Sequence, residues 1–193
     1  MSSLNALTDE MLIGLVNNGD TNAYNEIHCR YKQRIYYYIY RMLNGEKELS
    51  EDVLQEVFLS ISEFSKKFNP EKKFVTWIYT ITRNKIKNIY RERGSKSFQS
   101  IDEKIFNLET GSDRTVDMND FVRCLKVELE SLSEEERSTF WLRHQEGLRI
   151  DEISEILGSP EGTIHSRLHN IAKKMALRLS EYKVLLEEDG NGM

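Results

Sequence analysis

The sequence is poor in residues that interrupt helices and in apolar runs that could cross a membrane. Its 193 residues include only two prolines, Pro70 and Pro160, and almost every segment has apolar residues at helical spacing. We therefore predict an all-α fold class, with two small helical domains joined by a flexible linker. No stretch approaches the roughly 18 consecutive apolar residues of a membrane span, so we expect no membrane insertion.

Cysteine is equally scarce. Cys29 and Cys124 lie far apart in the sequence, inside helical patterns, so they do not indicate a disulfide framework. We expect both to be reduced, semi-buried thiols of a cytoplasmic protein. The first residues lack the cationic start and apolar run of a signal peptide, which also favours a cytoplasmic location.

The chain also lacks net positive charge and the common catalytic motifs. It has 27 Lys and Arg against 32 Asp and Glu, a formal net charge of −5, so any nucleic-acid surface must come from local segregation of charge. There is no C-x-x-C, no H-E-x-x-H and no glycine-rich phosphate loop, and the histidines form no compact set with the cysteines. We therefore expect no enzyme, no catalytic or metal site, no cofactor and no small-molecule substrate.

Helix start and stop signals divide the chain into two groups of helices. The first group is expected at about 9–18, 21–43, 50–67 and 74–93. Ser50 is the expected N-cap of the third of these helices. The second group is expected at about 117–131, 133–146, 149–157 and 160–180. The polar stretch between the groups is typical of a linker, which predicts a domain at 1–93, a linker at 94–116, a second domain at 117–182 and a tail at 183–193.

Residues 147–174 contain two short helical patterns separated by a tight turn. Gly158 can end the first helix in a left-handed conformation at little steric cost. Ser159 is the expected N-cap of the second helix, and Pro160 suits its first position. The second helix is expected to bury one apolar stripe: Ile164, Leu168, Ile171, Met175 and Leu179. This pattern predicts a helix-turn-helix.

The opposite face of that second helix is polar and weakly basic. It carries Gly162, His165, Ser166, His169, Asn170 and Lys173, with Arg167 and Lys174 on its flanks. No acid occurs between Gly162 and Lys174, whereas a solvated helix face usually mixes Glu and Lys. We therefore favour DNA binding over an ordinary structural hairpin, which would have the same helix pattern.

The predicted helix at 50–67 has an acidic outward face. The exposed residues are expected to be Asp52, Gln55, Glu56, Leu59 and Glu63. The buried residues are expected to be Val53, Leu54, Val57, Phe58, Ile61 and Phe64. Leu59 lies at the centre of the polar arc. It is either one of the single exposed leucines that are common on proteins, or the anchor for a partner with basic residues.

The predicted helix at 74–93 has the opposite charge. Between Lys66 and Arg93, nine cations stand against two acids. One face aligns Thr76, Thr80, Arg83, Asn84, Lys87 and Arg91, and Tyr79 and Tyr90 lie at its edges. Cations interleaved with hydroxyls, an amide and aromatic rings suit a nucleic-acid backbone and unstacked bases. The alternative is a solvated basic helix.

Taken together, these segments resemble the extracytoplasmic-function group of bacterial sigma factors, which keep the second and fourth conserved sigma regions. The first part of the resemblance is carried by Asp20-x-x-Ala23-Tyr24, Glu51-Asp52-Val53-Leu54-Gln55-Glu56-Val57-Phe58, Phe74-x-x-Trp77-Ile78-x-x-Ile81-x-Arg83-Asn84 and Arg91. The second part is carried by Leu129-x-x-Leu132, Glu152-Ile153, Leu157-Gly158 and Gly162-Thr163-Ile164-x-Ser166-Arg167-Leu168. The pieces cover nearly the whole chain outside the linker and tail.

The resemblance implies an alternative sigma factor whose partners are core RNA polymerase, promoter DNA and an anti-sigma factor. The residues implied for docking on a basic coiled coil of the polymerase clamp are Asp52, Gln55, Glu56 and Leu59. Those implied for the minus-10 promoter element and its non-template strand are Lys72, Lys73, Trp77, Arg83, Asn84, Lys87 and Arg91. Those implied for the minus-35 element are Arg149, Glu161, Gly162, Thr163, His165, Ser166, Arg167, His169, Asn170 and Lys173.

The helix-turn-helix departs from the family pattern at four positions. Arg149 stands where the family often has a Ser or Thr cap, and Ser154 replaces a small Ala. His165 and Asn170 stand where many members carry Lys and Arg. Recognition of the minus-35 element is therefore expected to depend on hydrogen bonding and DNA shape more than on charge.

Two rival interpretations remain. The first is a helix-turn-helix transcriptional regulator that is not a sigma factor, such as the output domain of a response regulator. Such a protein would need a receiver-like α/β first domain, and residues 1–93 have no strand pattern. The second rival is an enzyme, for which the sequence lacks the motifs named above.

Overall fold

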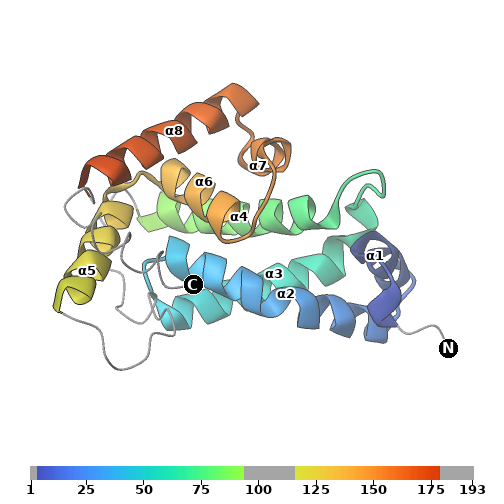
Figure 1. Cartoon of the computed structure of the whole chain (residues 1–193). Coiled ribbons are helices and arrows are strands. Elements are labelled where there is room, and N and C mark those ends of the chain that lie inside the picture. The colour runs from blue at the N-terminus through green and yellow to red at the C-terminus, as the bar shows by residue number, and fades with distance from the viewer. Residues whose placement is uncertain (1–3, 94–115, 179–193) are drawn as a thin grey trace, which may run out of the picture.

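The computed structural model describes residues 4–93 and 116–178, and within these residues it has eight α-helices, two short 3-10 helices and no strand (Figure 1). The all-α class predicted from helical periodicity is confirmed. Apart from Val116, the expected linker at 94–116 lies outside the described residues, and so does the expected tail at 183–193.

Four helices form an N-terminal bundle: α1 (Asp9–Asn17), α2 (Thr21–Met42), α3 (Lys47–Phe64) and α4 (Phe74–Arg93). The 3-10 helices are η1 (Leu4–Ala6) and η2 (Ser65–Lys67). Asp20 determines where α2 begins, because its Oδ1 accepts hydrogen bonds from the N–H groups of Asn22 (2.8 Å) and Ala23 (3.1 Å). These N–H groups have no partner within the helix, so the aspartate stabilises the turn between α1 and α2.

The start of α3 differs from the sequence prediction. The helix begins at Lys47 with Glu46 in the cap position, so Ser50 is not its N-cap. Ser50 is buried inside the first turns, where its hydroxyl donates to the Glu46 carbonyl at 2.6 Å. A serine can cap a helix or bond back to the preceding turn, and its identity alone does not distinguish the two.

The apolar faces of the bundle meet in a tightly packed core. Its fully buried members include Leu12, Ile13, Ile27, Ile35, Ile39, Ile61, Phe74 and Ile78. Phe64, which was predicted to be buried with them, is instead 41% exposed. α3 ends at Phe64 and the chain turns into η2, so this ring leaves the buried stripe and lies beneath the Lys67 ammonium, 4.5 Å from the ring centroid.

The remaining helices are α5 (Val116–Ser131), α6 (Glu134–His144), α7 (Ile150–Leu157) and α8 (Glu161–Arg178). α6 begins with a capping box. The Ser133 Oγ accepts from the Glu136 N–H at 3.2 Å, and the Glu136 carboxylate accepts from the Ser133 N–H at 3.0 Å. This reciprocal pair places the start of α6 one residue from its predicted position.

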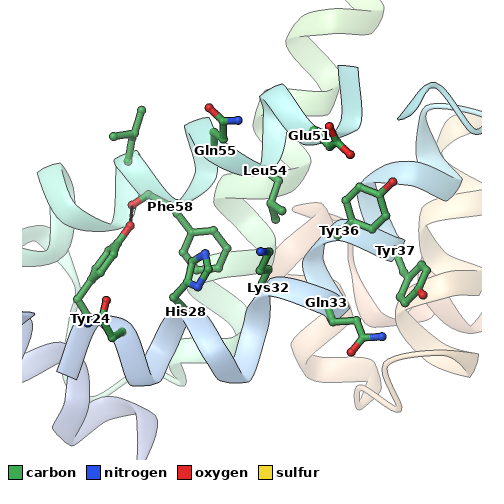
Figure 2. A pocket seen from close by; sticks show the side chains of 12 residues that line it. Tyr24, His28, Lys32, Gln33, Tyr36, Tyr37, Glu51, Leu54, Gln55 and Phe58 are labelled. Carbon is green, nitrogen blue, oxygen red and sulfur yellow. Dashed lines mark hydrogen bonds between the residues drawn. The ribbon is translucent and has the colours of Figure 1, made fainter. Parts of the chain in front are cut away.

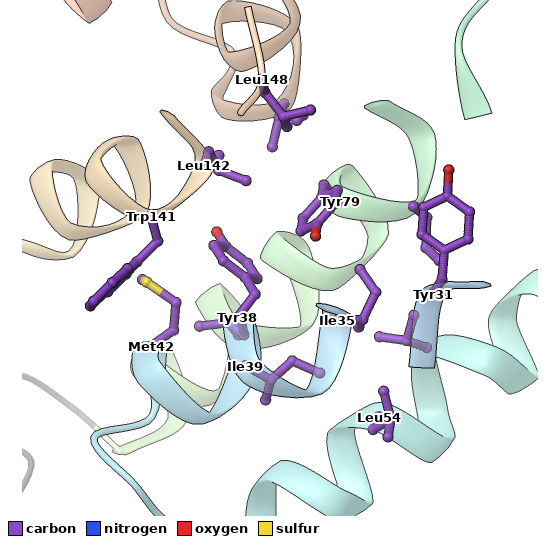
Figure 3. Close-up of a cluster of buried hydrophobic side chains, with 14 of the residues drawn as sticks. Tyr31, Ile35, Tyr38, Ile39, Met42, Leu54, Tyr79, Trp141, Leu142 and Leu148 are labelled. Atoms are coloured by element: carbon purple, nitrogen blue, oxygen red, sulfur yellow. The ribbon is translucent and has the colours of Figure 1, made fainter. Parts of the chain in front are cut away.

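The C-terminal helices pack against α2 and α4 of the bundle (Figure 1). Figure 3 shows Tyr38 and Met42 of α2 and Tyr79 of α4 facing Trp141 and Leu142 of α6. A buried hydrogen bond of 2.6 Å joins the Tyr38 hydroxyl to Ser138 Oγ. The helix with the predicted basic face, α4, is therefore covered on one side by the C-terminal helices.

Two residues of α3 give a direct test of the core. Ile61 is fully buried and Leu59, two positions earlier, is 59% exposed. Replacing Ile61 with Ala should lower the free energy of unfolding by about 2–5 kcal/mol. The substitution removes buried apolar atoms and leaves a cavity that the neighbouring side chains fill only in part. Urea denaturation followed by circular dichroism measures this change.

The matched control is Leu59→Ala, which removes a similar side chain from the same helix. Because Leu59 is already in solvent, its loss should change the free energy of unfolding by less than about 0.5 kcal/mol. Equal destabilisation by the two substitutions would contradict this orientation of α3.

Candidate protein and nucleic-acid interfaces

The acidic outward face of α3 is placed as predicted. Asp52, Gln55, Glu56 and Glu63 are exposed, and Leu59 lies among them. The Glu56 carboxylate is 3.1 Å from the Lys85 ammonium of α4. Asp52 and Glu63 take part in no ion pair among the described residues, so they give this face its negative charge.

Beside this face a groove of about 980 Å³ lies between α2 and α3 (Figure 2). The α3 wall includes Leu54, Gln55, Phe58 and Leu59. The α2 wall includes Tyr24, His28, Lys32, Gln33, Tyr36 and Tyr37. The groove therefore combines an apolar floor with hydroxyl, amide and charged groups at its rim, which is the composition of a protein-docking site.

Contacts at Phe58 join the α2 and α3 walls of the groove. The Tyr24 hydroxyl donates to the Phe58 carbonyl at 3.2 Å, and the His28 and Phe58 rings have centroids 4.5 Å apart. Burial, together with the nearby Lys32 ammonium, lowers the pKa of His28. The imidazole therefore favours its neutral form, which suits its packing against the Phe58 ring at an interplanar angle of 57°.

Sequence reasoning missed the α2 wall of this groove. The available signal is a stripe with four-residue spacing, Tyr24, His28, Lys32 and Tyr36, which lies beside the buried stripe of the same helix. A row of residues that are neither fully apolar nor fully charged is typical of a surface that becomes buried only in a complex.

The basic face of α4 is only partly open. Asn84, Lys87 and Arg91 are exposed, as predicted. Thr76 and Tyr79, which were predicted on or beside the same face, are buried. The periodicity of α4 alone could not reveal this, because helices that begin some 40 residues later in the chain contribute to the covering.

Trp77 lies at the start of α4, half-buried against two phenylalanines. Its ring centroid is 5.5 Å from that of Phe68 and 5.8 Å from that of Phe74. The cluster holds the loop that precedes α4 against the bundle. The position of Lys72 and Lys73, which lie in that loop, is thereby determined by aromatic packing.

Three of the predicted DNA-binding cations form ion pairs with the C-terminal helices. The Lys73 ammonium is 2.6 Å from Glu152 of α7, and the Arg83 guanidinium is 2.7 Å from Glu135 of α6. Lys72 pairs with Glu155 of α7. Burial alone would raise the pKa of the Glu152 carboxyl, but hydrogen bonds from Lys73 and from the Arg149 N–H outweigh it, so the pKa is lowered.

The helix-turn-helix is formed by α7 and α8. Gly158 ends α7 with φ 60° and ψ 33°, the left-handed conformation predicted for it. Ser154, which departs from the family pattern, donates its hydroxyl hydrogen to the Ser159 carbonyl at 2.7 Å and so bridges the turn. At the start of α7 the Arg149 N–H donates to Glu152 at 2.7 Å, and since arginine has no acceptor this is a one-sided cap.

The start of α8 corrects two expectations. The helix begins at Glu161, and the Pro160 carbonyl accepts from the Ile164 N–H at 3.1 Å, so Pro160 is the cap residue and not the first helical residue. Ser159 is therefore not the N-cap. Its hydroxyl accepts a hydrogen bond of 3.3 Å from Arg167 instead.

The solvent face of α8 contains most of the predicted minus-35 residues. The exposed members are Glu161, Gly162, His165, Ser166, His169, Asn170 and Lys173. Of the predicted buried stripe, Ile164 and Ile171 are buried, Leu168 and Met175 are only half-buried, and Leu179 lies outside the described residues. Arg149, the cap residue of α7, is also exposed and pairs with Asp151 in the first turn of that helix at 2.9 Å. These side chains form one continuous polar surface.

Arg167 and Lys174, which were predicted to flank this surface, point elsewhere. Arg167 lies 3.2 Å from Glu135 of α6, and Lys174 lies 2.8 Å from Glu136. Thr163 is half-buried at the same edge. The contacts of Arg167 and Lys174 depend on α6, which precedes the helix-turn-helix and is not part of its sequence pattern.

The remaining chemistry-bearing residues form no site within the described part of the chain. No group of three or more His, Cys, Asp or Glu is placed there to hold a metal ion. Both described cysteines are free thiols. Cys124 is half-buried as expected, whereas Cys29 is exposed because it lies on the face of α2 opposite the buried Ile27 and Tyr31. No helix of the described residues is long and apolar enough to span a membrane.

Two family matches cover the two groups of helices. Residues 28–96 match Sigma-70 region 2, and residues 123–175 match Sigma-70, region 4. The chain is 31% identical over 173 residues to the ECF RNA polymerase sigma-E factor of Escherichia coli, covering 84% of this chain and 89% of that protein. It is 29% identical over 172 residues to the protein of the same name from Haemophilus influenzae, covering 84% and 90%.

Solved structures show the same fold. The structure of CnrH in complex with the cytosolic domain of CnrY has a TM-score of 0.67 at 18% identity, covering 90% of this chain and 97% of that one. The sigma factor RpoE in complex with the anti-sigma factor NepR from Bartonella quintana has a TM-score of 0.62 at 20% identity, covering 81% and 96%.

The turn of the helix-turn-helix depends on one glycine, which can be tested by substitution. An added Cβ at Gly158 would meet no atom within 4 Å, so Gly158→Ala costs only backbone strain. The left-handed conformation should make this cost about 1–2 kcal/mol of unfolding free energy. Thermal denaturation of the purified chain measures it.

Gly162→Ala is the matched control. Gly162 lies in the first turn of α8, also with open space around it. Alanine favours the helical conformation, so this change should stabilise the chain by up to about 1 kcal/mol. If both substitutions shifted stability in the same direction, the conformation assigned to Gly158 would be wrong.

Proposed function

Because the chain belongs to the extracytoplasmic-function group of RNA polymerase sigma factors, we propose that it binds core RNA polymerase and directs transcription initiation at a dedicated set of promoters. The observation that carries this proposal is the 31% identity to a sigma-E factor along almost the full length of both chains, with sigma regions 2 and 4 in the same order. A regulator sharing only the helix-turn-helix would match over the last third alone. The chain itself supplies sequence selection, and the polymerase supplies catalysis.

The proposed division of the chain has the same order as the two family matches, at residues 28–96 and 123–175. Residues 1–93 form the domain that docks on polymerase and takes the minus-10 element, and residues 117–182 form the domain that reads the minus-35 element. Residues 94–116 connect them through the polymerase cleft. This arrangement places two DNA surfaces on one protein, so binding of one promoter element raises the effective concentration of the other.

The docking surface for polymerase is the acidic face of α3 with the adjoining groove. Leu59 is the apolar anchor, and Asp52, Gln55 and Glu56 surround it with acceptors for basic side chains. A basic coiled coil of the polymerase clamp has the complementary charge, and its helix can lie along the groove between α2 and α3. Acidic docking on one face is compatible with DNA binding on another because the two charges are segregated.

The surface for the minus-10 element is the basic face of α4 and the loop before it. The exposed cations Lys87 and Arg91 hold phosphates of the separated strand, and Asn84 offers hydrogen bonds. Lys72, Lys73, Trp77 and Arg83 complete the surface. Turning a base out of the duplex costs a few kcal/mol, which stacking and hydrogen bonds on this surface must offset.

The minus-35 surface is the exposed face of α8 with the start of α7. His165, Ser166, His169 and Asn170 reach base edges in the major groove, and Lys173 and Arg149 contact phosphates. Glu161, Gly162, Thr163 and Arg167 complete the predicted set. Short polar side chains dominate this face, so its affinity depends on hydrogen bonds more than on charge.

Two further roles belong to the same proposal. We infer an anti-sigma factor as a protein partner, because both structural relatives were solved with a bound partner chain. We also place the protein in the cytoplasm, where polymerase and promoters are. Neither role requires a cofactor, a metal or a small-molecule substrate.

Transcription reconstituted from purified components tests the function. The chain mixed with core polymerase and a genomic promoter library should yield run-off transcripts from a defined subset of fragments, and core polymerase alone should not. The absence of any promoter-dependent product would remove the sigma-factor assignment and leave the helix-turn-helix regulator as the explanation.

The division of labour between surfaces gives a second prediction. Leu59→Ala or Asp52→Ala should weaken binding to core polymerase, with Leu59→Ala causing a loss of about thirtyfold, equivalent to about 2 kcal/mol. Lys87→Ala or Arg91→Ala should leave core binding intact and reduce open-complex formation, because each removes a phosphate contact. Fluorescence anisotropy with core polymerase and permanganate footprinting of the melted strand measure the two steps.

Each pair of variants serves as the control for the other. The four side chains are exposed, so their removal should leave the thermal unfolding temperature close to that of the wild type. Equal loss of core binding in all four variants would contradict the separation of the two surfaces.

A further inference from the structure

The residues between η2 and α4 form an ordered loop with an exposed tip. The Asn69 carboxamide oxygen accepts a hydrogen bond from the Glu71 N–H at 3.0 Å, and the Asn69 carbonyl accepts one from the Lys72 N–H at 3.0 Å. Pro70 occupies the second position of this four-residue turn, where its fixed φ suits a reverse turn. Residues 69–73 are exposed, so the turn presents its polar groups to solvent although its backbone is held.

Aromatic packing holds both ends of this loop. Phe68, before the turn, and Phe74, after it, are buried, and their ring centroids are 6.0 Å apart. The Tyr31 ring of α2 packs edge-on against Phe74, with 5.2 Å between the centroids, and its hydroxyl donates to Asp9 of α1 at 2.5 Å. This chain of contacts connects α1 with the start of α4.

The residues directly before α4 cannot cap it. The first N–H groups of a helix have no acceptor within the helix, and a Ser, Thr, Asp or Asn just before the helix usually supplies one. α4 is preceded by Lys72 and Lys73, whose ammonium groups only donate. The first N–H of the helix belongs to Phe74, which is fully buried. Because an unsatisfied buried N–H is costly, its acceptor must come from elsewhere in the chain.

Glu10 of α1 supplies this acceptor. Its Oε1 lies 3.0 Å from the Phe74 nitrogen, a hydrogen bond between residues 64 positions apart. The negative carboxylate is also favoured at the positive end of the α4 dipole. Glu10 belongs to the first turn of α1, so one carboxylate lies at the N-terminal ends of two helices. Figure 1 shows α1 beside the end of α4 that the loop enters.

Contacts with α2 hold α1 in place. The Arg30 guanidinium of α2 is 2.8 Å from the Asp9 carboxylate. The same guanidinium donates to the carbonyls of Leu7 at 2.9 Å and of Asn5 at 3.1 Å, so it also holds the residues just before α1. Glu10 follows Asp9 directly in the chain. Its carboxylate is therefore presented to α4 by a helix whose own start is fixed.

We propose that Glu10 is a positioning residue for promoter opening: by capping α4, it holds the 69–73 loop in the conformation that accepts the non-template strand of the minus-10 element. The inference rests on the proposed role of this loop and of α4 in binding that strand. It extends the role to α1, which precedes the residues matched to Sigma-70 region 2. Glu10 touches no DNA and acts through the Phe74 backbone.

The physical benefit of this cap is preorganisation. A loop that is already ordered loses little conformational freedom when it binds a separated strand. More of the contact energy then offsets the cost of turning a base out of the duplex. Without the cap, the loop has to be ordered during the opening step itself, so this step should become slower while the first encounter with the duplex does not.

Two substitutions at Glu10 test the hydrogen bond. Glu10→Ala removes the acceptor of the Phe74 N–H. Glu10→Gln keeps an amide oxygen that can accept from this N–H, although a neutral acceptor bonds more weakly than a carboxylate. The matched control is Thr8→Ala, which removes the cap of α1, where the Thr8 Oγ1 accepts from the Met11 N–H at 3.3 Å. This control weakens α1 without removing an acceptor from α4.

Two measurements on the full-length proteins follow the loop and the opening step. Hydrogen–deuterium exchange with mass spectrometry reports the backbone N–H groups at the start of α4. Stopped-flow fluorescence with core polymerase uses a promoter fragment recovered from the run-off reaction, with 2-aminopurine in its minus-10 element. A series of protein concentrations separates the affinity of initial binding from the rate of strand opening.

The two Glu10 variants and the control should differ in a defined way. We expect Glu10→Ala to exchange faster at the start of α4 and to open the promoter about tenfold more slowly, the effect of one lost cap, with initial binding unchanged. Glu10→Gln should recover most of the opening rate. Thr8→Ala should open the promoter at the wild-type rate.

The outcomes separate this inference from the proposed function. A wild-type opening rate in Glu10→Ala, a loss that Glu10→Gln does not recover, or an equal loss in Thr8→Ala would each exclude the positioning role, even when all the proteins direct run-off transcription. An equal loss of initial binding and of opening would exclude it too, because the defect would then lie in the whole domain. If the wild type yields no promoter-dependent transcript, the proposed function fails first and the inference fails with it.

Discussion

The position of α4 between two groups of helices is the constraint on which the structure depends. One side of this helix buries Phe74, Ile78 and Ile86 in the N-terminal bundle. The other side offers Arg83 to the acids of α6, and the loop before it offers two lysines to α7. The same helix is thus a core element on one side and, as proposed, a DNA surface on another. Three of the ion pairs between the two groups of helices therefore use cations that are also proposed to contact DNA: Lys72, Lys73 and Arg83.

Charge segregation makes the several surfaces compatible on a net acidic chain. The outward face of α3 is acidic, the exposed part of α4 is basic, and the recognition face of α8 is nearly neutral. Under the proposed assignment, polymerase and DNA approach different sides, so neither is repelled by the charge that attracts the other. The weak charge of α8 also has a physical reason. A module delivered to DNA by a tether needs less electrostatic affinity than one that must find its site alone.

The sequence was sufficient for features that depend on local periodicity. The bounds of α4, the left-handed Gly158 and the exposed Leu59 follow from spacing and backbone preference. Features that depend on contacts between distant segments could not be predicted from the sequence. Tyr79 becomes buried and Arg167 turns inward because α6 packs beside them, and no pattern within α4 or α8 contains that information. The groove was not predicted: the sequence indicated only the acidic face of α3 beside it, because the α2 wall has neither a clear apolar nor a clear polar stripe.

The link between Tyr24 and Phe58 has a consequence for recognition. It joins the two helices that form the groove, and the His28 ring packs against the same phenylalanine. The shape of the groove is thus established when the bundle folds, before any partner arrives. A partner helix then loses its own freedom on binding, but the groove loses little, so more of the contact energy appears as affinity. For the docking proposed at this groove, such preorganisation favours association close to that of rigid bodies.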